Sequence, residues 1–345
     1  MLNIHQKIKT FLDINTTNAN TRNRHIDALK GVAIILMVLG HSIQINDPNY
    51  DNNLLFRIIY SFHMPMLMFL SGFILSTQFG YSLLNYLKKN AVRLLVPFIV
   101  WCIISYIFIR FQTNISLPAY LFDLMKSPAR GLWFLWILFL NSALLFGSLK
   151  LARYKKQQHR ENYYVIAAIL LSLTASADFL ALTDVKQYFP YYAAGFFSCK
   201  YGDALKARRK IIYLVAAVVF PLLVFSWKRN AFPTFYPVLL HFLNEDIARL
   251  VVSIYKYAVA FGGIALCSFI LERIRQSWLY SFLSWLGMLT LDVYSCHSYF
   301  IFEFSNVAWW YFPAAVVSLF FSLALSFLLL RRFKITKILF LGQTR

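Results

Sequence analysis

The sequence predicts an all-α fold, a polytopic membrane helix bundle with about ten transmembrane helices and both termini in the cytoplasm. Hydrophobic residues make up 59% of the 345-residue chain and charged residues only 14%, which leaves too little polar surface for an ordinary soluble domain. Long apolar runs recur along the chain, and the cations collect between them. These observations together predict an integral membrane protein.

The apolar runs are each a candidate to cross a hydrocarbon layer about 30 Å thick. The predicted spans are residues 26–44, 54–77, 92–111, 131–150, 163–181, 187–200, 211–227, 250–271, 278–302 and 309–330. The fifth and sixth are the least regular, because one contains Asp178 and the other is short and carries Pro190. Either of them is a candidate for a broken or tilted helix.

The distribution of cations tests this topology, since short cytoplasmic loops carry an excess of Lys and Arg. With the N-terminus inside, the outer segments hold only Arg57, Arg110, Lys126, Arg130, Lys186, Lys228, Arg229 and Arg249. The bias repeats at every loop, so we expect both termini in the cytoplasm. The net charge of +20 then reflects topology and does not indicate a nucleic-acid partner.

The chain divides into three parts. Residues 1–25 are polar and lack the apolar core and cleavage site of a signal peptide, so we expect a flexible cytoplasmic tail. Residues 26–330 form the transmembrane domain, and residues 331–345 a basic cytoplasmic tail. The external loops around 112–130 and 228–249 are too short to form a domain, which places any chemistry within the bundle or at its mouths.

Three histidines lie within apolar runs at a similar predicted depth, in the outer half of the membrane: His41, His63 and His297. Asp292 lies slightly deeper on the same run as His297. Polar groups at this depth are costly unless they face the bundle interior, a partner or water, and they therefore indicate function. The alternative is that each histidine hydrogen-bonds a neighbouring helix for packing.

An imidazole can take a proton from an acceptor hydroxyl or can itself be acylated. Metal binding is disfavoured, because the histidines lack the close spacing of ligand pairs and the four cysteines have no paired or metal-ligand spacing. Ser42 and Ser71 lie nearby in sequence, but neither sits in a Gly-x-Ser-x-Gly elbow. General base catalysis by His41 is the sharper hypothesis.

Lys30 precedes His41 by 11 residues on the first span. This step is about three turns of roughly 3.67 residues, so the two side chains share a helix face about 16 Å apart along the axis. Asp27 returns to within about 40° of that face, where an ion pair with Lys30 is favoured over contact with a substrate.

These residues belong to motifs through which the chain resembles the acyltransferase 3 family of integral-membrane acyltransferases. In chain order the motifs are Lys30 with His41, Ser61-Phe62-His63-Met64-Pro65-Met66 leading into Phe69-Leu70-Ser71-Gly72-Phe73, Arg93-Leu94-Leu95-Val96-Pro97, Leu132-Trp133-Phe134-Leu135 and Tyr294-Ser295-Cys296-His297. The commoner family form has arginine at position 30. The lysine form, after Ile26 and Asp27, resembles the branch of fucose 4-O-acetylases, and lysine keeps the charge without the bidentate fork.

The resemblance implies an acyl-CoA donor, acetyl-CoA by default, that acts as a substrate with no tightly bound cofactor. It implies a hydroxyl acceptor on an envelope glycan or a lipid-linked sugar, and a place in the bacterial inner membrane. The cations expected to hold the phosphates of coenzyme A are Lys30, Arg93, Lys88 and Lys89. For Lys88 and Lys89 the alternative is an ordinary positive-inside role. The oligomeric state is not indicated.

The resemblance also suggests roles around His41, which would act as the general base or, less favoured, as an acyl-carrying nucleophile. His63 and His297 would orient the acceptor or stabilise charge, with Arg57 and Asp292 as supporting groups. Trp133 would stack on a sugar face, or else belong to an interfacial aromatic belt.

Many relatives carry a C-terminal esterase-like domain, and we expect this chain to act without one, alone or with a separate partner. A transporter or flippase of a glycan or lipid intermediate is the rival class. It predicts repeat symmetry and several buried carboxylates, whereas the sequence has no visible repeat and only Asp292 and Asp178 well inside the spans. A structural partner in an envelope assembly would leave the histidines without a role.

Overall fold

The computed structural model describes residues 23–75, 81–110, 115–128, 132–156, 160–174, 179–229, 231–303 and 309–343, and these contain helices and no strand. In chain order the elements are α2 (Arg24–Asn46), η2 (Tyr50–Asn52), α3 (Leu54–Leu75), α4 (Leu83–Asn90), η4 (Ala91–Leu95), α5 (Val96–Arg110), α6 (Leu117–Lys126), α7 (Trp133–Tyr154), α8 (Glu161–Leu173), η7 (Phe179–Ala181), α9 (Leu182–Lys200), α10 (Gly202–Ala207), α11 (Arg209–Val224), α12 (Tyr236–Phe242), α13 (Glu245–Arg273), α14 (Trp278–Gly287), α15 (Thr290–Cys296), η8 (His297–Phe300), α16 (Tyr311–Leu325), η9 (Ser326–Leu330) and α17 (Lys334–Leu341).

Six helical segments within these ranges are long and apolar enough to cross a membrane: Arg24–Asn46, Leu54–Leu75, Leu83–Ile107, Trp133–Tyr154, Glu245–Arg273 and Tyr311–Leu330. Each corresponds to one of the predicted spans. The other four predicted spans correspond to α8, α9, α11 and the α14–α15 pair. The predicted run 278–302 is broken, because α14 ends at Gly287 and α15 begins at Thr290. Asp178 lies outside the described residues.

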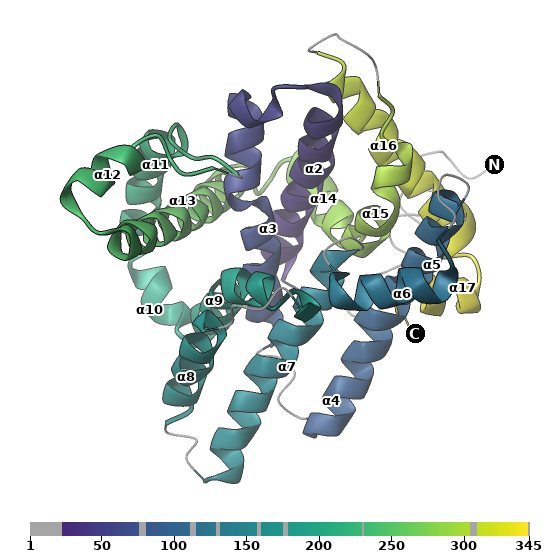
Figure 1. Ribbon diagram of the computed structural model, residues 1–345, viewed down its shortest axis with the longest axis horizontal. Helices are drawn as coiled ribbons and strands as arrows, with labels where there is room; N and C mark the ends of the chain where they lie inside the picture. The colour runs from purple at the N-terminus through teal and green to yellow at the C-terminus, as the bar shows by residue number, and fades with distance from the viewer. Residues whose placement is uncertain are drawn as a thin grey trace.

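Helices α2 and α3 stand side by side at the centre of the molecule and are connected at the top of Figure 1. Helix α2 starts at a capped end, where the Asn23 side chain accepts hydrogen bonds from the backbone N–H groups of His25 and Ile26. Helix α3 is continuous through Pro65. The histidine-bearing segments of both helices belong to the packed interior, because most of the residues around His41 and His63 are buried.

A close contact between glycines and backbone joins α2 to α14. A Cβ atom on Gly31 would lie 2.0 Å from the carbonyl oxygen of Leu283, and one on Gly287 would lie 1.8 Å from the carbonyl oxygen of Asp27. Both distances are far below van der Waals contact, so only glycine permits this approach. Small residues at helix crossings serve the same purpose in many membrane proteins.

Helices α3 and α9 approach each other in the same way. A Cβ atom on Gly72 would lie 1.8 Å from the carbonyl oxygen of Tyr192, and one on Gly195 would lie 1.9 Å from that of Phe69. The two crossings together fix α14 against α2 and α9 against α3. They bring the elements that line the candidate site around the central helix pair.

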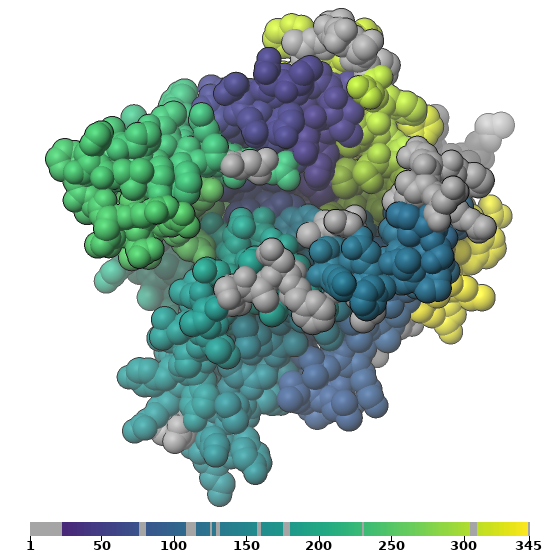
Figure 2. All heavy atoms as spheres, in the orientation of Figure 1, coloured from purple at the N-terminus to yellow at the C-terminus, as the bar shows by residue number. Residues whose placement is uncertain are grey.

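The remaining helices surround this centre. Helices α11, α12 and α13 form a group on the left of Figure 1, while α4, α7 and α8 project toward the bottom and α5, α6 and α17 lie on the right. The space-filling view in Figure 2 shows the α11–α13 group as a lobe beside α2 and α3. Large apolar side chains are exposed on these outer helices, including Leu214, Leu222 and Ile254, as expected of surfaces that face lipid.

The segment predicted as a basic C-terminal tail packs onto the bundle in its described part. Trp101 Nε1 donates a hydrogen bond to the carbonyl oxygen of Phe340 at 3.2 Å, and Leu341 is fully buried. Gly342 ends α17 with φ of +60°, and a Cβ atom there would lie 2.2 Å from the carbonyl oxygen of Arg93. Helix α17 therefore supports the backbone that carries Arg93.

Candidate active site

A cavity of about 380 Å³ opens beside the central helix pair, and we call it the histidine cavity. Its lining residues are Met37, His41, Tyr60, Ser61, His63, Met64, Pro65, Trp133, Asp184, Gln187, Tyr188, Tyr191, Trp227, Arg229, Lys256 and Tyr294. Imidazoles, aromatic rings and charged groups thus face one space. A volume of this order accommodates a small ligand such as a sugar unit.

The three predicted histidines are brought together. The ring centroids of His41 and His297 are 5.2 Å apart, and Tyr60 contacts both His41 and His63, with ring centroids 6.1 and 4.8 Å away. His41 comes from α2, His63 from α3 and His297 from η8, directly after α15. The cluster is therefore assembled from three elements.

Hydrogen bonds fix the tautomers of His63 and His297. Nδ1 of His63 lies 2.8 Å from the carbonyl oxygen of Ile59, and Nδ1 of His297 lies 2.9 Å from that of Tyr294. A carbonyl oxygen can only accept, so each ring donates from Nδ1 and, when neutral, keeps a lone pair on Nε2. Nε2 of His297 is buried and has no hydrogen-bond partner among the described residues.

His41 is oriented by Tyr60 and Gln44. The Tyr60 hydroxyl donates to Oε1 of Gln44 at 2.9 Å, and it lies 3.3 Å from Nδ1 of His41. Its single hydrogen is used on Gln44, so toward His41 the tyrosine oxygen accepts and Nδ1 donates. Nε2 of neutral His41 is then the nitrogen with a free lone pair, as a general base requires.

A second cavity, of about 240 Å³, lies beside the first and contains both Lys30 and Arg93. We call it the cationic cavity. Arg93 belongs to η4, a π-helical turn between α4 and α5, and such turns occur frequently at functional sites. Lys30 and His41 share α2 but face different cavities, which matches their predicted separation along one helix face.

Tyr294 is the one lining residue common to these two cavities. Its hydroxyl accepts a hydrogen bond from the backbone N–H of Phe134 at 3.2 Å, and the two rings are 5.5 Å apart. Because the hydroxyl only accepts in this bond, its own hydrogen remains available. A residue with an available hydroxyl hydrogen thus lines both cavities.

Comparison with known proteins identifies the family of the chain. A family model described as an acyltransferase domain matches residues 23–341. The chain belongs to the acyltransferase 3 family. It is an acyltransferase and an integral membrane protein.

Two relatives of the acyltransferase are the nodulation proteins NolL of Sinorhizobium fredii and of Mesorhizobium japonicum. The first is 25% identical over 267 residues, which cover 72% of this chain and 69% of the relative. The second is 25% identical over 262 residues, which cover 72% of this chain and 68% of the relative. No solved structure matches the chain.

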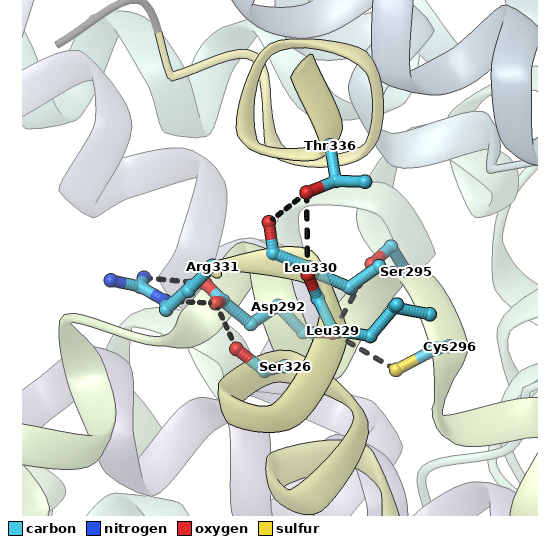
Figure 3. A network of polar contacts seen from close by, with 8 residues as sticks. All are labelled: Asp292, Ser295, Cys296, Ser326, Leu329, Leu330, Arg331 and Thr336. Atoms are coloured by element: carbon cyan, nitrogen blue, oxygen red, sulfur yellow. Dashed lines mark hydrogen bonds and ion pairs between the residues drawn. The ribbon is translucent and has the colours of Figure 1, made fainter. Parts of the chain in front are cut away.

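Asp292, predicted as a supporting group of the site, instead forms an ion pair with Arg331 in the acyltransferase (Figure 3). Its carboxylate accepts hydrogen bonds from Nε and Nη2 of Arg331 at 2.5 and 2.9 Å and from Oγ of Ser326 at 2.5 Å. It lines neither cavity. This buried ion pair fastens α15 to the end of η9. Element η9 directly continues α16.

The other predicted site residues fall into two groups. Trp133 lines the histidine cavity and packs on Tyr188, with ring centroids 5.0 Å apart. Arg57 lies outside both linings, and its guanidinium donates to the carbonyl oxygen of Phe225 at 2.9 Å. Lys88 and Lys89 are exposed at the end of α4 and also lie outside both linings.

Sequence reasoning missed several residues that line the histidine cavity, above all Tyr60, Arg229 and Lys256. The sequence could have indicated Lys256, because a charged residue within an apolar span indicates function by itself. Nothing in the sequence distinguishes Arg229 from an ordinary cation of an external loop. Among the described residues no group of three or more His, Cys, Asp or Glu side chains is arranged to hold a metal ion.

Proposed function

We propose that this acyltransferase moves an acyl group, acetyl by default, from cytoplasmic acyl-CoA to a hydroxyl of a sugar in an envelope glycan or a lipid-linked glycan. The observation that carries the proposal is the meeting of the two cavities at Tyr294. One cavity offers cations for a phosphorylated donor. The other offers an oriented base and aromatic walls for a hydroxylated acceptor.

The cationic cavity is the proposed donor site. Lys30 and Arg93 would bind phosphates of coenzyme A, Arg93 through its planar fork and Lys30 as a point charge. The pantetheine arm would then extend toward Tyr294 and bring the thioester to the junction. Lys88 and Lys89 remain candidates for weaker electrostatic attraction at the surface, where exposed cations contribute little to affinity.

His41 is the proposed general base. Its Nε2 would take the proton from the acceptor hydroxyl while the hydroxyl oxygen attacks the thioester carbonyl carbon. The C–S bond then breaks, the coenzyme A sulfur leaves as a thiolate, and the imidazolium returns the proton to it. The products are an ester and free coenzyme A, and no covalent intermediate on the protein is needed.

Tyr294 is the proposed donor to the developing oxyanion. Tyr294 lines both cavities, and its hydroxyl hydrogen would donate to the negative charge that forms on the thioester oxygen. His63 and His297 would orient the acceptor through their Nε2 lone pairs, which can accept hydrogen bonds from sugar hydroxyls. Trp133 and Tyr188 would stack on a sugar face.

The proposal places the protein in the bacterial inner membrane with both termini in the cytoplasm. The donor site then faces the compartment that supplies acyl-CoA, and the histidine cavity lies toward the outer side. Membrane lipids and the two substrates are the partners it requires, and no nucleic acid is involved. Arg57 would support the site indirectly, through the backbone of the loop that carries Trp227 and Arg229.

Transfer of labelled acetyl from acetyl-CoA to envelope glycan fragments in membranes containing the protein tests the proposal. We expect His41→Ala to lower transfer by a factor of about 10² to 10⁴. His241→Ala is the matched control, because His241 is exposed on α12 and lies outside both cavities. Wild-type transfer by the His41 variant would refute the base. No acyl transfer by the wild type to any hydroxyl acceptor would refute the proposed reaction.

A further inference from the structure

The histidine cavity carries an excess of positive charge that the transfer of an acyl group to a hydroxyl does not require. Arg229 and Lys256 both line it, and Asp184 is the one carboxylate among its lining residues. Neither cation forms an ion pair with a described carboxylate. The site is therefore built to attract negative charge.

Arg229 is held at the histidine cavity by an aromatic contact. Its guanidinium lies over the ring of Tyr60, with Cζ 4.6 Å from the ring centroid. A cation–π contact uses no hydrogen bond, so it leaves the N–H donors of the guanidinium for other partners. The same tyrosine orients His41, so an anion bound at Arg229 is placed close to the base.

Lys256 supplies the second cation from another element. It lies within α13, a helix of 29 residues that is apolar enough to span a membrane. A lysine in such a helix is costly unless it faces a partner or a water-filled space. Lys256 is half-buried and faces the histidine cavity, which identifies the cavity as the place where its charge is used.

The donor does not account for these cations. Lys30 and Arg93 line the separate cationic cavity, which shares only Tyr294 with the histidine cavity. The aromatic walls around Arg229 and Lys256, formed by Trp133, Tyr188 and others, suit a sugar. The positive charge and the aromatic walls of the histidine cavity together fit an acidic saccharide better than a neutral one.

We infer that the acceptor presented to His41 carries an anionic group, a carboxylate or a phosphate, that Arg229 and Lys256 bind. The inference rests on the proposed function and adds the class of acceptor to it. The shared chemistry is an oxyanion attached to a sugar. Its two sources are the carboxylate of an acidic sugar and the phosphate that links a sugar to a lipid or to a glycan.

Equilibrium binding to the purified full-length protein tests the inference without relying on acyl transfer. The probes are methyl glucoside, methyl glucuronide and glucose 1-phosphate, which share a ring and differ in charge. We expect at least one anionic probe to bind about tenfold or more tightly than the neutral one. Preference for the glucuronide identifies an acidic sugar, and preference for the phosphate identifies a phosphate-linked one. Equal binding of all three probes would overturn the inference.

Variants test whether the preference for the anionic probe depends on Arg229 and Lys256. Arg229→Ala and Lys256→Met should each remove most of the preference for the anionic probe, while Arg229→Lys should retain part of it. Lys228→Ala is the matched control, since it removes the neighbouring cation of the same loop, which lies outside the cavity lining. Undiminished preference in both cavity variants would overturn the assignment. Unchanged acetyl-CoA binding in each variant verifies that it is folded.

The design separates failure of this inference from failure of the proposed reaction. His41→Ala should keep the wild-type preference for the anionic probe, because the base is not an anion ligand, while losing acyl transfer. A protein that binds the anionic probe through Arg229 and transfers no acyl group would contradict the proposed function alone. A protein that transfers acyl groups equally to neutral and anionic acceptors would contradict the inference alone.

Discussion

Replacement of Asp292 by alanine decides whether this carboxylate holds the bundle together or takes part in chemistry. The side chain of Asp292 is 1% exposed and that of Arg331 15%, and two hydrogen bonds join them. Removing one partner of a buried pair leaves an uncompensated charge and costs about 3–5 kcal/mol. For a chain of this size that corresponds to a decrease of about 4–7 °C in the unfolding midpoint.

The assay is thermal unfolding in detergent at a fixed scan rate, together with acyl transfer measured below the transition. The double variant Asp292→Ala/Arg331→Met should be destabilised less than the single variant, because the unpaired guanidinium is also removed. Asp203→Ala is the matched control, since it breaks an exposed ion pair with Lys206 and should leave the midpoint unchanged. An Asp292 variant with the wild-type midpoint and no transfer would refute the structural role and place the carboxylate in the chemistry.

Three further substitutions test other parts of the arrangement. Tyr60→Phe removes the acceptor of the His41 Nδ1–H bond and should lower kcat about two- to tenfold without changing the KM for acetyl-CoA; an unchanged kcat would contradict the orienting role. Tyr294→Phe should lower kcat about 10²-fold with normal folding, and steady-state kinetics showing a change in KM alone would exclude an oxyanion donor. Gly31→Leu should prevent α14 from packing on α2 and abolish folded protein on size-exclusion chromatography, whereas Gly147→Leu, at a position with open space, should not.

The sequence predicted the helices better than their breaks. Apolar runs identified all-α membrane architecture because each run is a local property of the chain. The break between Gly287 and Thr290 lies inside one continuous apolar run, so hydropathy gave no sign of it. Gly287, at the end of α14, packs closely against the backbone of Asp27 on α2, and hydropathy does not report a tertiary contact of this kind.

The candidate site could be predicted where it depends on local properties of the chain. These are the depth of a residue in its span and its position around the helix. Depth placed His41, His63 and His297 together, and the 11-residue spacing placed Lys30 and His41 on one face of α2. Partners between distant segments were not predictable in this way. Asp292 was correctly predicted to be buried, but its partner Arg331 comes from a segment predicted to be a tail, and 39 residues separate the two.

Tyr60 connects the two inferences about the histidine cavity, since it contacts both His41 and Arg229. Proton transfer from the acceptor would create an imidazolium near a guanidinium that has no carboxylate partner among the described residues, and like charges in a low-dielectric site repel. An anion bound at Arg229 offsets that repulsion at the moment the proton moves. An anionic acceptor should therefore have a higher kcat as well as a lower KM than its neutral counterpart, and Arg229→Ala should remove both differences. Steady-state kinetics with methyl glucoside and the preferred anionic acceptor measure this, and an advantage confined to KM would show that the anion only anchors the sugar.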